Sequence, residues 1–158
     1  MPNKLTFTIK PIKELVEKYV GMSEVVVDPF ANSCKYGTIT NDLNPEFDTN
    51  YHMDAREFLQ QVNSNIADLV LYDPPYSLRQ ISECYKGFGI KGFDGKASWR
   101  ARHLDEIARI SKRGSYVISC GWNTNGVGMK RGFMIEEILI VPHGGSKNDT
   151  LITVEKKI

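Results

Sequence analysis

Short apolar runs that lead to an acidic residue are the feature of this sequence that most restricts its fold. Three such runs lead to Asp28, Asp42 and Asp73, and they are Val25–Val27, Thr38–Thr40 and Leu69–Tyr72. A continuous apolar run of this length, bounded by turn residues, predicts a strand buried on both faces. Such strands are typical of open, mostly parallel α/β sheets, whose ligands bind beyond the carboxyl ends of the strands. We therefore expect the three acids to lie along one edge of a sheet.

The rest of the chain continues this α/β pattern. Six apolar runs predict strands: Glu24–Val27, Thr38–Thr40, Leu69–Tyr72, Ser115–Cys120, Glu136–Val141 and Thr150–Val154. Three stretches have helical spacing or follow an N-cap residue: Ile12–Tyr19, Ala55–Val62 and His103–Ile110. Residues 142–149 are too few for a helical crossover, so the last two strands should be antiparallel neighbours. With 158 residues and no repeat or linker, the chain is expected to form one domain, 1–158.

Composition excludes several classes of protein. The three cysteines form no Cys-x-x-Cys pair, so neither a disulfide framework nor a zinc site is expected. No apolar stretch approaches the roughly 20 residues that span a bilayer, and the first residues lack the apolar core of a secretion signal. We expect a cytoplasmic protein that uses no metal and contacts no membrane. The net charge of +1 neither favours nor excludes nucleic acid as a partner.

The most informative motif is Asp73-Pro74-Pro75-Tyr76, which directly follows a predicted buried strand. As a bare tetrapeptide it could be a stiff turn. At a strand end, it offers a carboxylate and the Pro74 carbonyl in fixed positions, because the prolines restrict the backbone. Two such acceptors can take both hydrogens of an exocyclic amine, a weak nucleophile whose lone pair is delocalised into its ring. The Tyr76 ring could stack on the base that carries this amine.

With this tetrapeptide, the chain resembles the Asp-Pro-Pro-Tyr amino-methyltransferases of DNA. Two further stretches, Thr40-Asn41-Asp42-Leu43-Asn44-Pro45 and Pro142-His143-Gly144-Gly145, are most similar to those of small phage-borne adenine methyltransferases. The resemblance implies a Rossmann-like class I sheet, mostly parallel with a C-terminal antiparallel hairpin. It also implies adenine N6 methylation in DNA with S-adenosyl-L-methionine as cofactor, after the base is flipped out of the duplex. Asp73, Pro74, Pro75 and Tyr76 would be the catalytic residues.

The resemblance also assigns cofactor-binding residues along the first half of the chain. The expected cofactor-binding residues are Thr8, Lys10, Pro11, Asp28, Pro29, Phe30, Ala31, Asn32, Ser33, Asp42, Leu43, Asp54, Ala55 and Asp73. Within this set, the element around Lys10 would lie beside the methionine part of the cofactor. Asp42 would accept the ribose hydroxyls, and Asp54 would read the adenine amine.

The first motif departs from the family pattern. Asn32, Ser33 and Cys34 stand where the family has Gly-x-Gly, whose glycines let the backbone approach the ligand. The connection from Phe30 to Thr38 is also shorter than the dozen or so residues that a parallel crossover normally needs. We therefore expect the first crossover helix to be missing or a single turn, and the helix that follows Asp42 to be cut short. Weaker cofactor binding is one possible consequence.

The second departure is the lack of a separate target-recognition domain. Segment 77–102 is the one candidate for contacting substrate, since it is basic, rich in glycine and interleaved with aromatic residues. A flexible solvated loop is the alternative interpretation. The expected substrate-binding residues are Ser77, Arg79, Lys86, Lys91, Lys96, Trp99 and Arg100, with Trp122 and Asn123 from the stretch after the fourth predicted strand. That stretch could equally be a plain turn.

Two other functions remain open from the sequence. Methylation of an RNA base is one, because the tetrapeptide recognises an amine and not a sugar. A binding module that has lost catalysis is the other, although four retained acids argue against it. A nicotinamide dehydrogenase is disfavoured because no Gly-x-Gly-x-x-Gly follows the first strand. A homodimer or a partner subunit could supply sequence recognition.

Overall fold

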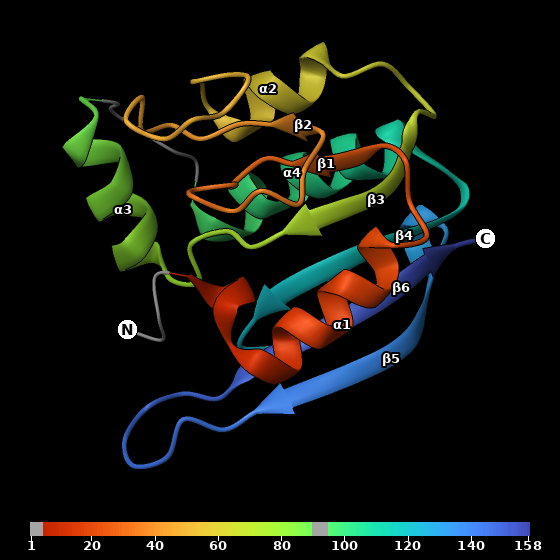
Figure 1. Cartoon of the computed structure of the whole chain (residues 1–158). Helices are drawn as coiled ribbons and strands as arrows, with labels where there is room; N and C mark the ends of the chain where they lie inside the picture. The colour runs from red at the N-terminus through yellow and green to blue at the C-terminus, as the bar shows by residue number, and fades with distance from the viewer. Residues whose placement is uncertain (1–4, 90–94) are drawn as a thin grey trace.

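The computed structural model describes residues 5–89 and 95–158 and contains one six-stranded sheet. The strands lie in the order β2-β1-β3-β4-β6-β5 (Figure 1). Their bounds are Val26–Asp28 (β1), Ile39–Thr40 (β2), Ala67–Tyr72 (β3), Ser111–Gly121 (β4), Phe133–Val141 (β5) and Thr150–Lys157 (β6). Each of the six expected strands is present, and the C-terminal three are longer than their apolar runs.

The pairing directions confirm the expected fold class. β1 pairs in parallel with β2 and β3, and β3 pairs in parallel with β4. β6 then inserts antiparallel between β4 and β5, so the chain ends in an antiparallel hairpin. Because β1, β2 and β3 run in the same direction, their carboxyl ends meet at one edge of the sheet.

Helices cover both faces of the sheet (Figure 1). Their bounds are Lys10–Val20 (α1), Ala55–Gln61 (α2), Leu78–Gly87 (α3) and Lys96–Ile110 (α4), with short 3-10 turns at Thr6–Thr8 and Met129–Arg131. α1 places Ile12, Val16 and Tyr19 against one face of the sheet. α2 and α4 pack on the other face, where α4 contributes Leu104, Ile107 and Ile110. Successive buried residues of β1 and β3 point to opposite faces of the sheet, so these strands contribute to the cores on both faces.

Segment 77–102 was expected to be a loop, but helices occupy most of its described residues, 77–89 and 95–102. α3 occupies Leu78–Gly87, and α4 begins at Lys96 rather than at His103. The signal for α3 was present in the sequence. Ser77 and Gln80 form a capping box, and Ile81 and Tyr85 are buried four residues apart. The glycines near the end of α3 concealed this periodicity.

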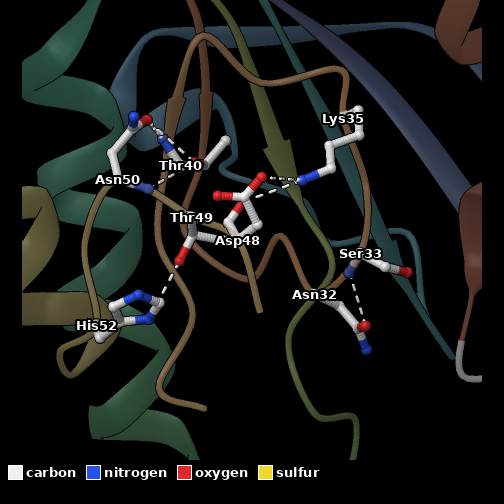
Figure 2. A network of polar contacts seen from close by, with 8 residues as sticks. All are labelled: Asn32, Ser33, Lys35, Thr40, Asp48, Thr49, Asn50 and His52. Atoms are coloured by element: carbon white, nitrogen blue, oxygen red, sulfur yellow. Dashed lines mark hydrogen bonds and ion pairs between the residues drawn. The ribbon is translucent and has the colours of Figure 1, made fainter. Parts of the chain in front are cut away.

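The missing first crossover helix is confirmed, since no helix lies between β1 and β2, a stretch that is fully described. Polar contacts hold this connection against the segment that follows β2 (Figure 2). Asn50 accepts hydrogen bonds from the Thr40 backbone and hydroxyl at 2.8 and 3.0 Å. Lys35 pairs with Asp48 at 3.1 Å. α2 is also short, with seven residues.

Within residues 5–89 and 95–158, no helix is long and apolar enough to cross a membrane.

Candidate active site

A cavity of about 970 Å³ lies at the carboxyl ends of β1, β2 and β3. This is the upper end of the range for small-molecule sites, about 300–1,000 Å³. Among the expected cofactor-binding residues, those that line it are Thr8, Pro29, Phe30, Ala31, Asn32, Ser33, Asp42, Leu43, Asp54, Ala55 and Asp73. Pro74, Pro75 and Tyr76 line it as well. The fold thus brings together residues that are far apart in the sequence.

Three expected cofactor-binding residues lie outside this lining. Lys10 and Pro11 form the exposed first turn of α1, whose buried face begins at Ile12. In their place the preceding 3-10 turn contributes Thr6 and Phe7. Asp28 is fully buried at the end of β1.

Asp73 follows β3 directly and already holds a hydrogen bond. The Tyr76 hydroxyl donates to Asp73 Oδ1 at 2.5 Å. Burial raises the pKa of Asp73 above its usual range, while hydrogen bonds from Tyr76 and Thr6 lower it. Burial also raises the pKa of Tyr76, so the phenol keeps its proton and acts as the donor.

Asp28 carries a buried oxygen without a partner. Its Oδ1 accepts the Phe30 backbone N–H at 3.2 Å, whereas Oδ2 has no hydrogen-bond partner among the described residues. Burial, and to a smaller extent the nearby carboxylates of Asp73 and Asp42, raise the pKa of Asp28 to about 8, although hydrogen bonds from the Phe30 backbone and the Cys34 thiol act to lower it. The three acids therefore lie close enough to influence one another, as the strand pattern predicts.

The turn after β1 contains a non-glycine residue in a conformation that favours glycine. Asn32 has a φ of 49°, in the left-handed region where glycine is most common and asparagine is tolerated. Its backbone N–H donates to Asp42 Oδ2 at 2.8 Å. The other oxygen of Asp42 accepts the Asn44 N–H at 2.9 Å. Two backbone amides thus fix the Asp42 carboxylate at the cavity wall, and each oxygen retains a further lone pair.

Asp54 joins α2 to α3. Its Oδ1 caps α2 by accepting the Arg56 N–H at 3.0 Å. Its Oδ2 accepts the Tyr85 hydroxyl at 2.5 Å, and that hydroxyl in turn accepts the Trp99 indole N–H at 2.6 Å. Because Tyr85 lies on α3, this chain of hydrogen bonds holds the helix beside the cavity. Figure 1 shows α3 beyond the carboxyl end of β3.

The expected substrate-binding residues separate into two groups. Ser77 caps α3, Arg79 pairs with Glu83 at 2.7 Å, and Lys86 is exposed near the end of the same helix. Trp99 is buried at the cavity wall, so it is no exposed stacking platform. Lys91 lies outside the described residues, as does the side chain of Lys96.

The second group lies behind the Pro74–Tyr76 segment. Arg100, Trp122 and Asn123 line a recess of about 30 Å³ together with that segment. The Trp122 ring meets the Tyr76 ring edge-on, with centroids 5.7 Å apart. Trp122 is 37% exposed, enough to present part of its ring to a ligand. Together, Tyr76 and Trp122 form an aromatic corner next to the Asp73 carboxylate.

Sequence reasoning missed several lining residues, among them Ile81, Cys84, Tyr85 and Phe88. All four lie on or just after α3, and the capping box and apolar spacing of that segment could have indicated them. Lys13 was also missed, because a lysine in the middle of α1 carries no distinguishing pattern.

No protein-family model and no curated protein matches this sequence. Solved structures do match its fold. The N-methyltransferase NodS from Bradyrhizobium japonicum aligns with a TM-score of 0.64 at 8% identity, covering 98% of each chain. A Burkholderia thailandensis N1-methyltransferase with bound S-adenosylhomocysteine aligns at 0.62 and 11% identity, covering 94% of this chain and 77% of the other. The chain has the fold of class I S-adenosylmethionine-dependent methyltransferases.

TrmN from Thermus thermophilus has the same class I fold in one part of a longer chain. It aligns with a TM-score of 0.61 at 15% identity, and the alignment covers 93% of this chain. It covers only 48% of TrmN, so the present chain spans about half that protein's length. In open sheets of this class, ligands bind beyond the carboxyl ends of the strands, which is where the cavity lies.

Proposed function

We propose that this protein uses S-adenosyl-L-methionine to methylate an exocyclic amine of a nucleic-acid base, adenine N6 in DNA. The observation that carries the proposal is the position of Asp73 and Pro74. They follow β3 directly and face a cavity whose wall also contains Asp42 and Asp54. Regulation or protection of DNA in the cytoplasm would be the setting for such an activity.

The residues around the cavity suit this cofactor. Asp42 is held by two backbone amides and would bind the ribose hydroxyls, while Asp54 would accept the adenine amine. The cofactor carries a sulfonium and an ammonium group, which fits a cavity whose wall contains Asp42, Asp54 and Asp73. When bound, it supplies an electrophilic methyl group. The cavity volume of about 970 Å³ leaves room for a base beside it.

Each residue of the tetrapeptide has a part in the proposal. The Asp73 carboxylate and the Pro74 carbonyl would accept the two amine hydrogens and orient the nitrogen for attack. For this, the Tyr76 hydroxyl must leave Asp73 Oδ1. The freed Tyr76 ring would stack on the base, a contact worth about 1–3 kcal/mol. The methylated nitrogen is acidic and loses its extra proton without a dedicated base.

RNA is the second candidate substrate, since none of these contacts reads the sugar. A module that has lost cofactor binding has less support, because the left-handed Asn32 preserves the turn that the missing glycines would otherwise form. A partner subunit or a homodimer would supply sequence recognition in this proposal.

The test compares duplex DNA and structured RNA in one assay with methyl-labelled cofactor. We expect N6-methyladenine in DNA. Asp73→Ala should reduce turnover at least 10³-fold, with the dissociation constant for S-adenosylhomocysteine changed less than threefold. Asp42→Ala should do the reverse and raise that constant by tenfold or more. Label in RNA alone would remove DNA as the substrate, and loss of binding alone in both variants would refute these roles.

A further inference from the structure

Glu155, on β6, is a buried carboxylate that the proposed chemistry does not use. It is 1% exposed and accepts the backbone N–H of Val127 at 2.6 Å and of Gly128 at 2.9 Å. Burying a carboxylate costs several kcal/mol unless hydrogen bonds compensate. Charge-assisted bonds from backbone amides are among the strongest of those available. The carboxylate is therefore committed to one loop, residues 122–128, which follows β4.

The loop closes directly on this carboxylate. A Cβ atom on Gly126 would lie 2.2 Å from Glu155 Oε2, so no side chain fits between them. Gly126 also has a φ of 53°, which favours glycine. From the other side, Arg100 donates to the Gly126 carbonyl at 3.5 Å. The side chain of Val127 is buried in the core. The distal half of the loop is thus fixed at three successive residues.

The proximal half of the same loop carries the aromatic corner. Trp122 directly follows the last residue of β4, and with Asn123 it lines the recess behind Pro74 and Tyr76. The loop is only seven residues long, with β4 at its near end and Glu155 at its far end, so Asn123, Thr124 and Asn125 alone separate Trp122 from the anchored residues. The contact that this anchor would affect is the one between the Trp122 and Tyr76 rings, whose centroids are 5.7 Å apart.

We propose that Glu155 is a positioning residue that holds loop 122–128 so that Trp122 forms one wall of the target-base subsite. It acts through the loop and touches neither substrate nor cofactor. The inference rests on the proposed function for its effect on methyl transfer, while its effect on the loop can be measured without any substrate.

The test is Glu155→Gln, with Glu136→Gln as matched control, because Glu136 is exposed on β5. Glutamine retains one acceptor oxygen and turns an amide NH2 toward the second backbone N–H. We expect amide hydrogen exchange at Val127 and Gly128 to accelerate at least tenfold. Acrylamide quenching of Trp122 fluorescence, taken as the difference from a Trp122→Phe protein, should increase at least twofold. The control should change neither.

With methyl transfer as the second readout, KM for the nucleic acid should rise or kcat fall by about tenfold in Glu155→Gln. The dissociation constant for S-adenosylhomocysteine should stay within twofold, which general damage to the fold would not allow. Equal losses of cofactor binding and turnover, or unchanged exchange and quenching, would overturn the proposal.

Two further outcomes can be distinguished: failure of the proposed function, and failure of the Glu155→Gln variant to fold. If the wild-type protein methylates no nucleic acid, the proposed function fails, but exchange and quenching still decide whether Glu155 orders the loop. If Glu155→Gln does not fold, Gly126→Ala disturbs the same contact from the loop side. It should produce the same increase in Trp122 quenching at unchanged affinity for S-adenosylhomocysteine. Unchanged quenching of Trp122 in this variant would refute the proposal that Glu155 holds the loop.

Discussion

At the scale of single residues, the four aspartates of the site differ in the hydrogen bonds that their carboxylate oxygens accept. Asp42 and Asp54 have both oxygens engaged, Asp73 holds the Tyr76 phenol, and Asp28 has one oxygen without a described partner. Oxygens that accept hydrogen bonds from backbone amides are fixed in place and can accept one more. A phenol on a rotatable side chain, by contrast, can be displaced. This difference separates Asp42, whose two described hydrogen bonds come from backbone amides, from the proposed catalytic Asp73. Asp54 is intermediate, because one of its oxygens accepts a backbone amide and the other accepts the Tyr85 phenol.

The raised pKa of Asp28 makes a prediction about stability. An unfolded chain ionises Asp28 above pH about 4, whereas the folded chain keeps the proton up to pH about 8. The stability contributed by the protonated form is therefore lost as pH rises through this window, by on the order of 1.4 kcal/mol per pH unit. In urea unfolding, Asp28→Asn should gain about 1–4 kcal/mol relative to wild type between pH 5 and pH 8.

The exposed Asp149→Asn provides the control for this measurement and should show no such gain. Equal effects of Asp28→Asn at both pH values would mean that Asp28 is ionised in the folded protein throughout.

At the scale of elements, α3 is the part of the fold that the cavity depends on most. It contributes Ile81, Cys84 and Tyr85 to the cavity wall. Its contacts with the rest of the protein include a small cluster, formed by Ile81, Tyr85 and Trp99 with Phe30 and Leu43. The bond from Tyr85 to Asp54 connects this cluster to α2. A helix that lies beyond the end of the sheet, with Ile81 and Tyr85 as its buried residues, should open more readily than the sheet itself.

Tyr85→Phe tests this attachment. The variant removes a hydrogen bond to a carboxylate, worth about 1.5–3 kcal/mol, and leaves the Trp99 indole N–H without its acceptor. We expect opening of α3 to become about tenfold more frequent. Alkylation of Cys84, resolved by peptide mass spectrometry, should accelerate by a similar factor, because burial currently raises the pKa of this thiol.

The buried Cys120, on β4, supplies an internal reference for global unfolding. Parallel acceleration at Cys84 and Cys120 would show that the whole fold is loosened, and an unchanged Cys84 would show that Tyr85 does not hold the helix.

At the scale of the whole molecule, one cavity at the edge of one sheet receives residues from nearly every element of the N-terminal half. The antiparallel hairpin at the other edge contributes Glu155 and, through it, the order of loop 122–128. Both halves of the sheet therefore meet at the Pro74–Tyr76 segment. A ligand in the cavity contacts many elements at once, so its binding should stabilise the whole domain.

Thermal unfolding measures this coupling. S-adenosylhomocysteine at a hundred times its dissociation constant should add about 2.7 kcal/mol to the free energy of unfolding. For a domain of 158 residues this corresponds to a rise in Tm of about 5–10 °C. NAD at the same concentration should not raise the Tm. In Asp42→Ala, most of the rise in Tm with S-adenosylhomocysteine should be lost. A rise with NAD alone would favour a dehydrogenase instead.

The sequence alone determined the sheet and the edge where the site lies. Apolar runs bounded by turn residues predicted all six strands, because local periodicity reports which faces are buried. Eight residues between the last two strands required an antiparallel hairpin, and the tetrapeptide after β3 is the basis of the proposed amine chemistry. The absence of the first crossover helix also followed from the short connection between Phe30 and Thr38 alone.

Only the tertiary structure decided how these parts engage one another. Tyr85 bonds to Asp54 across 31 residues, Glu155 anchors Val127 across 28, and Asp42 fixes the left-handed Asn32. No local pattern encodes such pairs, because each depends on which side chains the folded sheet brings within hydrogen-bond distance. The same reason separates Lys10 and Pro11 from the cavity and buries Trp99, since the direction of a side chain is set by its helix and by the packing around it.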